Sequence, residues 1–236
     1  MIWLFAVFLV IWGNVVSSLL GATARLPGGS AQFVNAGVVL VVLSIGVALS
    51  VGLSRSHLGL GSGAARGALV GGALAAVVAL AGVAILRLAA PAIVGVPVDY
   101  APLRQVTADA LATHLVIFLP FGAVIPEELA FRGVLLGALA RARGSRDAVI
   151  GSSAAFALWH GAVALVTISD TSLGPPSLWF LPAAVAALLV VFGGGVAFAI
   201  LRIRSGTLAT TIAAHWVFNS VVLLALWATQ SVTPRA

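Results

Sequence analysis

The sequence predicts an all-α fold, a polytopic bundle of membrane helices, and three observations support this class. Hydrophobic residues make up 61% of the 236 residues and charged residues 8%, whereas soluble domains carry about 25% charged residues. Several apolar runs approach or exceed the ~20 residues that a helix needs to cross a bilayer. No segment shows the alternating pattern of a membrane β-strand, which would be about ten residues long.

The apolar runs indicate about seven transmembrane helices in a single membrane domain that spans residues 1–236. We expect these helices at roughly 2–22, 31–53, 67–88, 111–140, 148–168, 178–201 and 207–230. The segment 1–88 supplies three accessory N-terminal spans.

The segment 111–140 is longer than a simple span requires. A helix of this length would measure ~45 Å, and the hydrocarbon core of a bilayer is ~30 Å thick. Pro120 and Pro126 are expected to kink or break it. It therefore forms either one long bent helix or two helical pieces.

The arginines predict how the helices are oriented. The net charge of +6 comes from twelve arginines and no lysine, and cytoplasmic loops are rich in such residues for topological reasons, so this charge does not indicate nucleic-acid binding. With the N-terminus cytoplasmic and the C-terminus outside, seven arginines fall on the cytoplasmic side: Arg55, Arg66, Arg141, Arg143, Arg146, Arg202 and Arg204. Four fall outside: Arg25, Arg87, Arg104 and Arg235. This bias favours a single crossing for 111–140 in an integral protein of the plasma membrane.

Two adjacent glutamates are the only ones in the chain, and they lie within a predicted span. An ionisable side chain at membrane depth costs about 2.5–3.5 kcal/mol on insertion scales, so such residues are rare and usually functional. Glu128 and Arg132 are four residues apart and share a helix face, whereas Glu127 points about 100° away. We expect Arg132 to neutralise and orient Glu128, which leaves Glu127 free to act as a general base. A purely structural interhelical salt bridge is the alternative.

Two histidines lie at the same predicted depth as the glutamates. Glu128, His160 and His215 are 13, 13 and 11 residues from the charged loops at 141–147 and 202–206. These separations correspond to ~17–20 Å along each helix. The two loops are separated by two spans and so lie on the same side of the membrane. A lone histidine in a membrane helix is more often a packing residue, but three helices at one depth predict a single buried polar site.

The residue types at this depth suit hydrolysis. A carboxylate and imidazoles can activate water as general bases or through a divalent metal, and zinc is the metal that Glu127, His160 and His215 suit best. Asn219 shares a helix face with His215 and could donate a hydrogen bond to an oxyanion. The absence of cysteine excludes a cysteine nucleophile and thiolate ligands. His114 lies ~21 Å from Glu128 along the helix, outside the site unless the segment folds back.

Three motifs in this order resemble the CAAX-protease and bacteriocin-processing family of intramembrane proteases, also called the CPBP or Abi family. The family pattern is Glu-Glu-x-x-x-Arg, Phe-x-x-x-His and His-x-x-x-Asn. Here these motifs read Glu127-Glu128 to Arg132, Phe156 to His160, and His215 to Asn219. The match covers roughly 110–225, which the resemblance identifies as the catalytic core.

The resemblance implies an intramembrane metalloendopeptidase that hydrolyses a peptide or protein substrate at or in the lipid bilayer. It implies that Glu127 activates water with His160 as its partner, and that His215 and Asn219 stabilise the oxyanion or help to hold a metal. Glu128 and Arg132 would support them. We expect the cavity of such an enzyme to open towards the cytoplasm. A metal-free glutamate mechanism stays open, as do a non-catalytic immunity or scaffold protein and an ion-coupled transporter.

Overall fold

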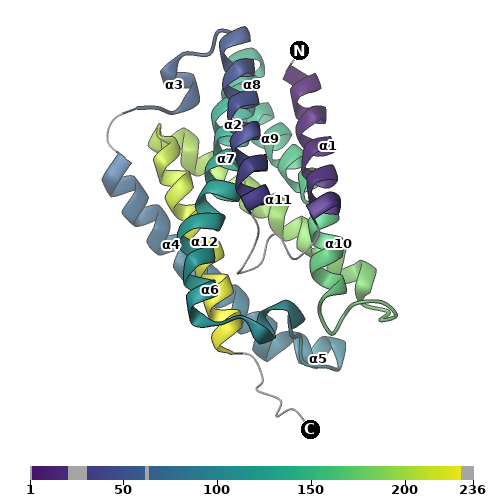
Figure 1. Ribbon diagram of the computed structural model, residues 1–236. Coiled ribbons are helices and arrows are strands. Elements are labelled where there is room, and N and C mark those ends of the chain that lie inside the picture. Colours follow the sequence, from purple (N-terminus) through teal and green to yellow (C-terminus); the bar gives the residue numbers. More distant parts are fainter. Residues whose placement is uncertain (1, 21–30, 62–63, 230–236) are drawn as a thin grey trace.

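The computed structural model describes residues 2–20, 31–61 and 64–229, which form helices and connecting turns without a β-strand (Figure 1). The predicted all-α fold class is confirmed. The α-helices are α1 (Ile2–Leu20), α2 (Ala31–Ser50), α3 (Arg55–Leu58), α4 (Ala64–Ala84), α5 (Ala90–Val94), α6 (Ala108–Thr113), α7 (Ile125–Glu128), α8 (Leu136–Arg143), α9 (Ser145–Trp159), α10 (Gly161–Ser169), α11 (Phe180–Ser205) and α12 (Leu208–Ala228). Ile85–Ala89, His114–Val124 and Leu129–Leu135 are π-helical, and Ala101–Gln105 is a 3-10 helix.

Six helical segments in the described part of the chain are long and apolar enough to cross a membrane. The pair α9 and α10 supplies a seventh span if its two helices, which are bent by 43°, cross together. The protein is therefore an integral, multi-pass membrane protein. Arg25 and Arg235, which entered the prediction of orientation, lie outside the described residues.

The long segment Ala108–Arg143 is one continuous helical span of 36 residues. Pro120 lies inside a π-helical stretch, and Pro126 lies in the first turn of α7. The wider π turn relocates backbone hydrogen bonds, so a proline that lacks an N–H does not have to end the helix. The structure thus has the single crossing that the arginine distribution favours, and the segment is not split into two pieces.

One end of the bundle gathers the loops that carry most of the arginines. Arg141 donates hydrogen bonds to the carbonyls of Val51 and Gly52, and the Leu208 N–H donates to the Gly59 carbonyl. These contacts join the segments 51–61, 141–147 and 202–207, which we call the arginine-rich end. Because these loops lie at one end of the bundle, residues at equal separations from them along their helices lie at similar depths.

The opposite end is formed by the segment 85–109, the turn at 170–179 and the end of α12. The Ala101 N–H donates to the Asp170 carbonyl at 3.0 Å, and the Trp227 indole donates to the Val106 carbonyl at 2.9 Å. Arg87 and Asp99 form an ion pair at 2.8 Å. Figure 1 shows α5, α6 and the tip of α10 together at this end, with α3 and α8 at the other.

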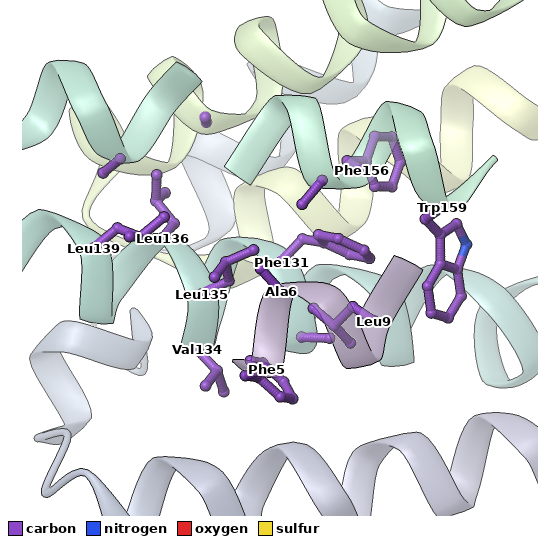
Figure 2. Close-up of a cluster of buried hydrophobic side chains, with 14 of the residues drawn as sticks. Phe5, Ala6, Leu9, Phe131, Val134, Leu135, Leu136, Leu139, Phe156 and Trp159 are labelled. Atoms are coloured by element: carbon purple, nitrogen blue, oxygen red, sulfur yellow. The ribbon is translucent and has the colours of Figure 1, made fainter. Parts of the chain in front are cut away.

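The main hydrophobic core lies between the two glutamates and the arginine-rich end. Figure 2 shows Phe131 of the segment Ala108–Arg143, which we call the Glu-Glu helix, beside Leu9 of α1 and Phe156 of α9, with Leu135 and Leu139 further along the same helix. Every residue from 130 to 139 is buried. Close packing of this kind is what stabilises helix association in a membrane, where burial from lipid adds little driving force.

Candidate active site

Glu128 is enclosed by two cationic or hydrogen-bonding side chains. Its Oε1 atom lies 3.1 Å from Arg132 Nη1 and accepts a hydrogen bond from His215 Nδ1 at 2.9 Å. The exposed fractions of the Glu128 and Arg132 side chains are 0% and 1%. A buried charge of this kind is tolerated only when it is paired. The predicted pairing of Glu128 with Arg132 is therefore present, and the hydrogen bond from His215 ties the Glu-Glu helix to α12.

Aromatic rings cover the remaining surface of the Arg132 guanidinium. Its Cζ atom lies 3.9 Å from the ring centroid of Phe156 and 5.4 Å from that of Phe198. The face of an aromatic ring attracts a cation. Phe156, predicted as a supporting residue, thus stacks on the arginine that holds Glu128.

Glu127 points in a different direction from its neighbour and lies beside His160. The distance from Glu127 Oε2 to His160 Nε2 is 3.9 Å, which is too long for a direct hydrogen bond and leaves room for a shared water molecule. The exposed fractions of these side chains are 12% and 18%, against 0% for Glu128. The two carboxylates therefore occupy distinct environments.

Backbone and side-chain contacts determine the orientation of both imidazole rings. His160 Nδ1 lies 2.8 Å from the Phe156 carbonyl, which can only accept, so Nδ1 carries the proton. His215 Nδ1 in the same way donates to Glu128. In their neutral forms both rings therefore offer the lone pair of Nε2.

His160 lies at the bend between α9 and α10, and a residue of α1 bridges this bend. Asn14 donates to the Leu158 carbonyl at 2.9 Å and accepts from the Ala162 N–H at 2.7 Å. Its amide thus satisfies backbone groups on both sides of His160 that the bend removes from helical hydrogen bonding. Asn14 was missed from the sequence, where a single asparagine in the first span gives no signal of a distant partner.

A cavity of about 720 Å³ adjoins these residues. Glu127, His160, His215 and Asn219 line it together with mostly apolar side chains. Glu128 and Arg132 do not line it, since they are sealed behind the cavity wall. His114 also lines the cavity, away from the glutamates along the same span, so it does not join the four polar residues.

The residues predicted to bind zinc are Glu127, His160 and His215. Among residues 2–20, 31–61 and 64–229, no group of three or more His, Asp or Glu side chains is placed to hold a metal ion. Glu127 and His160 are close, but His215 is bound to Glu128 through one of its two nitrogens. The arrangement as it stands does not form a three-ligand metal site.

A comparison with known protein families finds a match to part of the chain. Residues 109–221 match the family described as Rce1-like, type II CAAX prenyl endopeptidase Rce1-like. No curated protein and no solved structure matches the chain. The matched range includes the three motifs, and the resemblance predicted from them is confirmed.

Proposed function

We propose that this chain, whose residues 109–221 match the Rce1-like family of type II CAAX prenyl endopeptidases, is an intramembrane endopeptidase. The observation that carries the proposal is the contrast between two adjacent carboxylates. Glu127 borders the cavity beside His160, whereas Glu128 is enclosed by Arg132 and His215. A base that must reach water and a carboxylate that only orients its neighbours require these two environments.

In the proposed reaction Glu127 and His160 hold one water molecule between them. Glu127 accepts a proton from this water, and the resulting hydroxide adds to the carbonyl carbon of the peptide bond. The proton on Glu127 is then transferred to the leaving amine as the carbon–nitrogen bond breaks. Glu127 thereby returns to its starting state.

His215 and Asn219 are proposed to stabilise the oxyanion that forms on the peptide carbonyl. The Asn219 amide can donate to it directly. His215 can donate through Nε2 when both of its ring nitrogens carry a proton, and the bond from Nδ1 to Glu128 fixes the orientation of its ring. Donors aimed at a developing charge in a site of low dielectric contribute strongly to catalysis.

The test is cleavage by the Glu127→Gln variant. Glutamine has nearly the same shape but does not accept a proton, so turnover should fall at least ~100-fold while the protein stays folded. Purified protein would be assayed on a prenylated peptide with a CAAX terminus, and a proteomic comparison of cells with wild type and variant would test other membrane substrates. Asp147→Asn, the same change at an exposed carboxylate of α9, is the matched control and should leave turnover unchanged. Full turnover by Glu127→Gln would refute the mechanism.

A zinc requirement stays a prediction that metal analysis can decide. The metal content of purified wild-type protein would be compared with that of His160→Ala. A stoichiometric metal in the wild type that is lost in the variant would show that the site rearranges to bind metal. Equal, negligible contents would support the metal-free reaction written above.

A further inference from the structure

A second, smaller pocket lies at the surface of the bundle between α9 and α11. Its volume is about 300 Å³, and its lining comes from residues 145–150 of α9 and 200–204 of α11. We call it the α9–α11 groove. None of its lining residues borders the cavity beside Glu127, so it is a separate feature of the molecule.

The α9–α11 groove lies where the two helices leave the membrane. α9 begins at the arginine-rich end and α11 ends there, so the two helices run antiparallel. They touch further into the bundle, where a Cβ atom placed on Gly195 would lie 3.1 Å from Ser153 Cβ. The residues that line the groove lie between this contact and the two helix ends, within the outermost turns of α9 and α11.

The wall of the groove is apolar along most of its length. Val149, Ile150, Ile200 and Ile203 line it, and the exposed fractions of the three isoleucines are 49%, 38% and 41%. α11 is long and apolar enough to cross the membrane, and α9 forms part of a further span. Exposed isoleucines on such helices face lipid, so this wall suits an acyl chain.

Two arginines, one from each helix, line the same groove. Arg146 lies in the first turn of α9 and Arg204 in the last turn of α11, and both are exposed. Within the described residues, no ion pair or hydrogen bond holds either guanidinium group. Asp147, the neighbouring carboxylate, does not line the groove. The groove therefore carries two positive charges without a counter-ion from the protein.

Other arginines at this end of the bundle are held by the protein itself. Arg141 donates to the carbonyls of Val51 and Gly52, and Arg202 donates to those of Ser56 and His57. The Arg143 Cζ atom lies 5.7 Å from the ring centroid of Trp3. The two arginines of the groove differ from these three, because their charges remain available to a ligand.

We propose that the α9–α11 groove binds one anionic phospholipid. Its phosphate lies between Arg146 and Arg204, and one acyl chain lies along Ile150, Ile200 and Ile203. A guanidinium group binds phosphate oxygens through paired hydrogen bonds. Basic pockets between membrane helices are typical sites for acidic headgroups, and the cytoplasmic leaflet, which arginine-rich loops are expected to face, carries anionic lipids.

A lipid in this groove contacts two helices that both support the polar site. Phe156 of α9 and Phe198 of α11 lie against the Arg132 guanidinium, at 3.9 and 5.4 Å from ring centroid to Cζ. A ligand that binds only when α9 and α11 are packed together stabilises the folded protein. This consequence can be measured without a substrate, so it does not rest on the proposed peptidase activity.

The experiment measures lipid binding by the full-length protein, purified in a neutral detergent. Native mass spectrometry would count bound lipid, and thermal unfolding would give the melting temperature. The probes are phosphatidylglycerol, phosphatidylcholine with the same acyl chains, and inorganic phosphate. The double variant Arg146→Gln/Arg204→Gln removes both charges of the groove. The matched control, Arg55→Gln/Arg66→Gln, removes two charges from exposed arginines that do not line the groove.

Wild type and the control should bind phosphatidylglycerol in preference to phosphatidylcholine. Their melting temperatures should rise by roughly 3–5 °C at a phosphatidylglycerol concentration about ten times its Kd. Each arginine near a membrane surface contributes about fivefold in affinity for acidic lipid, so the groove variant should bind roughly 25-fold more weakly. An equal loss in the control would overturn the groove as the site. Equal binding of phosphatidylcholine, or an equal shift with inorganic phosphate, would overturn an anionic lipid as the occupant.

A further variant tests the apolar part of the groove with both arginines in place. Ile203→Trp fills the groove from α11, so phosphatidylglycerol should bind more weakly while the melting temperature without lipid stays close to that of wild type. Unchanged affinity would overturn the placement of the acyl chain. This comparison keeps the proposal testable even if the double arginine variant does not fold.

Discussion

The span Ala108–Arg143 has two halves of different character, which meet at Glu127 and Glu128. After Glu128, every residue from 130 to 139 is buried, and Phe131, Val134, Leu135, Leu136 and Leu139 belong to the core drawn in Figure 2. Before Glu127, Leu119 and Ala123 border the cavity, and Val116 and Phe121 are 62% and 53% exposed towards the bilayer. One half of the helix is packed on all sides, and the other is the wall of a cavity.

This difference explains why the two glutamates lie in different environments although they are neighbours. Glu128 belongs to the packed half, where rigid surroundings can hold Arg132 and His215 in place. Glu127 belongs to the half with the cavity, where a base can reach water and a substrate. A reactive group supported by a rigid shell on one side and open on the other is what catalysis requires.

The largest expected effect is a difference in stability between two equivalent leucine deletions. Leu135→Ala removes a side chain that is 0% exposed in the packed half, and it should lower the free energy of unfolding by about 2 kcal/mol, because the void cannot close. Leu119→Ala removes the same atoms from the cavity wall and should cost roughly 1 kcal/mol, because one side of Leu119 already lacks neighbours. Denaturant unfolding in detergent would measure both. Equal losses would show that the cavity half is as tightly packed as the core.

A run of three glycines in α11 offers a second comparison, this time of substrate binding. Cβ atoms placed on Gly193 or Gly194 meet nothing within 4 Å, but only Gly194 lines the cavity. Gly194→Leu should therefore raise the KM for substrate about tenfold, or ~1.4 kcal/mol, by occupying the cavity without disturbing the fold. Gly193→Leu is the matched control and should leave KM unchanged.

Gly195 shows what the same substitution means on the packed side. A Cβ atom there would lie 3.1 Å from Ser153 Cβ, so Gly195→Ala should lower the melting temperature and leave KM unaltered. If Gly194→Leu destabilises the protein as Gly195→Ala does, the space beside Gly194 is not a free cavity.

Local geometry accounts for the part of the site that could be predicted from the sequence. The pairing of Glu128 with Arg132 follows from a spacing of four residues, and the convergence of His160 and His215 follows from counting residues to charged loops. Both arguments use only the rise and pitch of a helix. They needed no knowledge of which helices are neighbours.

The features that escaped prediction depend on contacts between distant segments. The segment 148–168 was expected as one span, and the bend of 43° between α9 and α10 at His160, where the sequence has no proline, was not predicted. Pro120 does not break its helix, because it lies within a π-helical stretch that the sequence did not indicate. The cavity is lined by residues of α1, α2, α4, α11 and α12 as well as by the site residues, and no residue spacing encodes which helices meet there.

Asn14 illustrates this dependence and gives the smallest of the expected effects. Its amide bridges the Leu158 carbonyl and the Ala162 N–H across the bend, so it positions His160 without lining the cavity itself. Asn14→Ala should lower kcat about fivefold, equivalent to the ~1 kcal/mol of one net hydrogen bond, and should leave KM unchanged because the cavity wall is intact. Steady-state cleavage would measure both constants.

Two further variants separate positioning from a general loss of packing in α1. Asn14→Asp keeps an oxygen that accepts from the Ala162 N–H but loses the donation to Leu158, so its kcat should fall between those of wild type and Asn14→Ala. Ser18→Ala, one turn along α1, removes an exposed hydroxyl that donates to the Asn14 carbonyl, and it should leave kcat unchanged. A rise in KM with constant kcat for Asn14→Ala would contradict the positioning role. It would mean that Asn14 shapes the wall of the cavity instead of holding His160 in place.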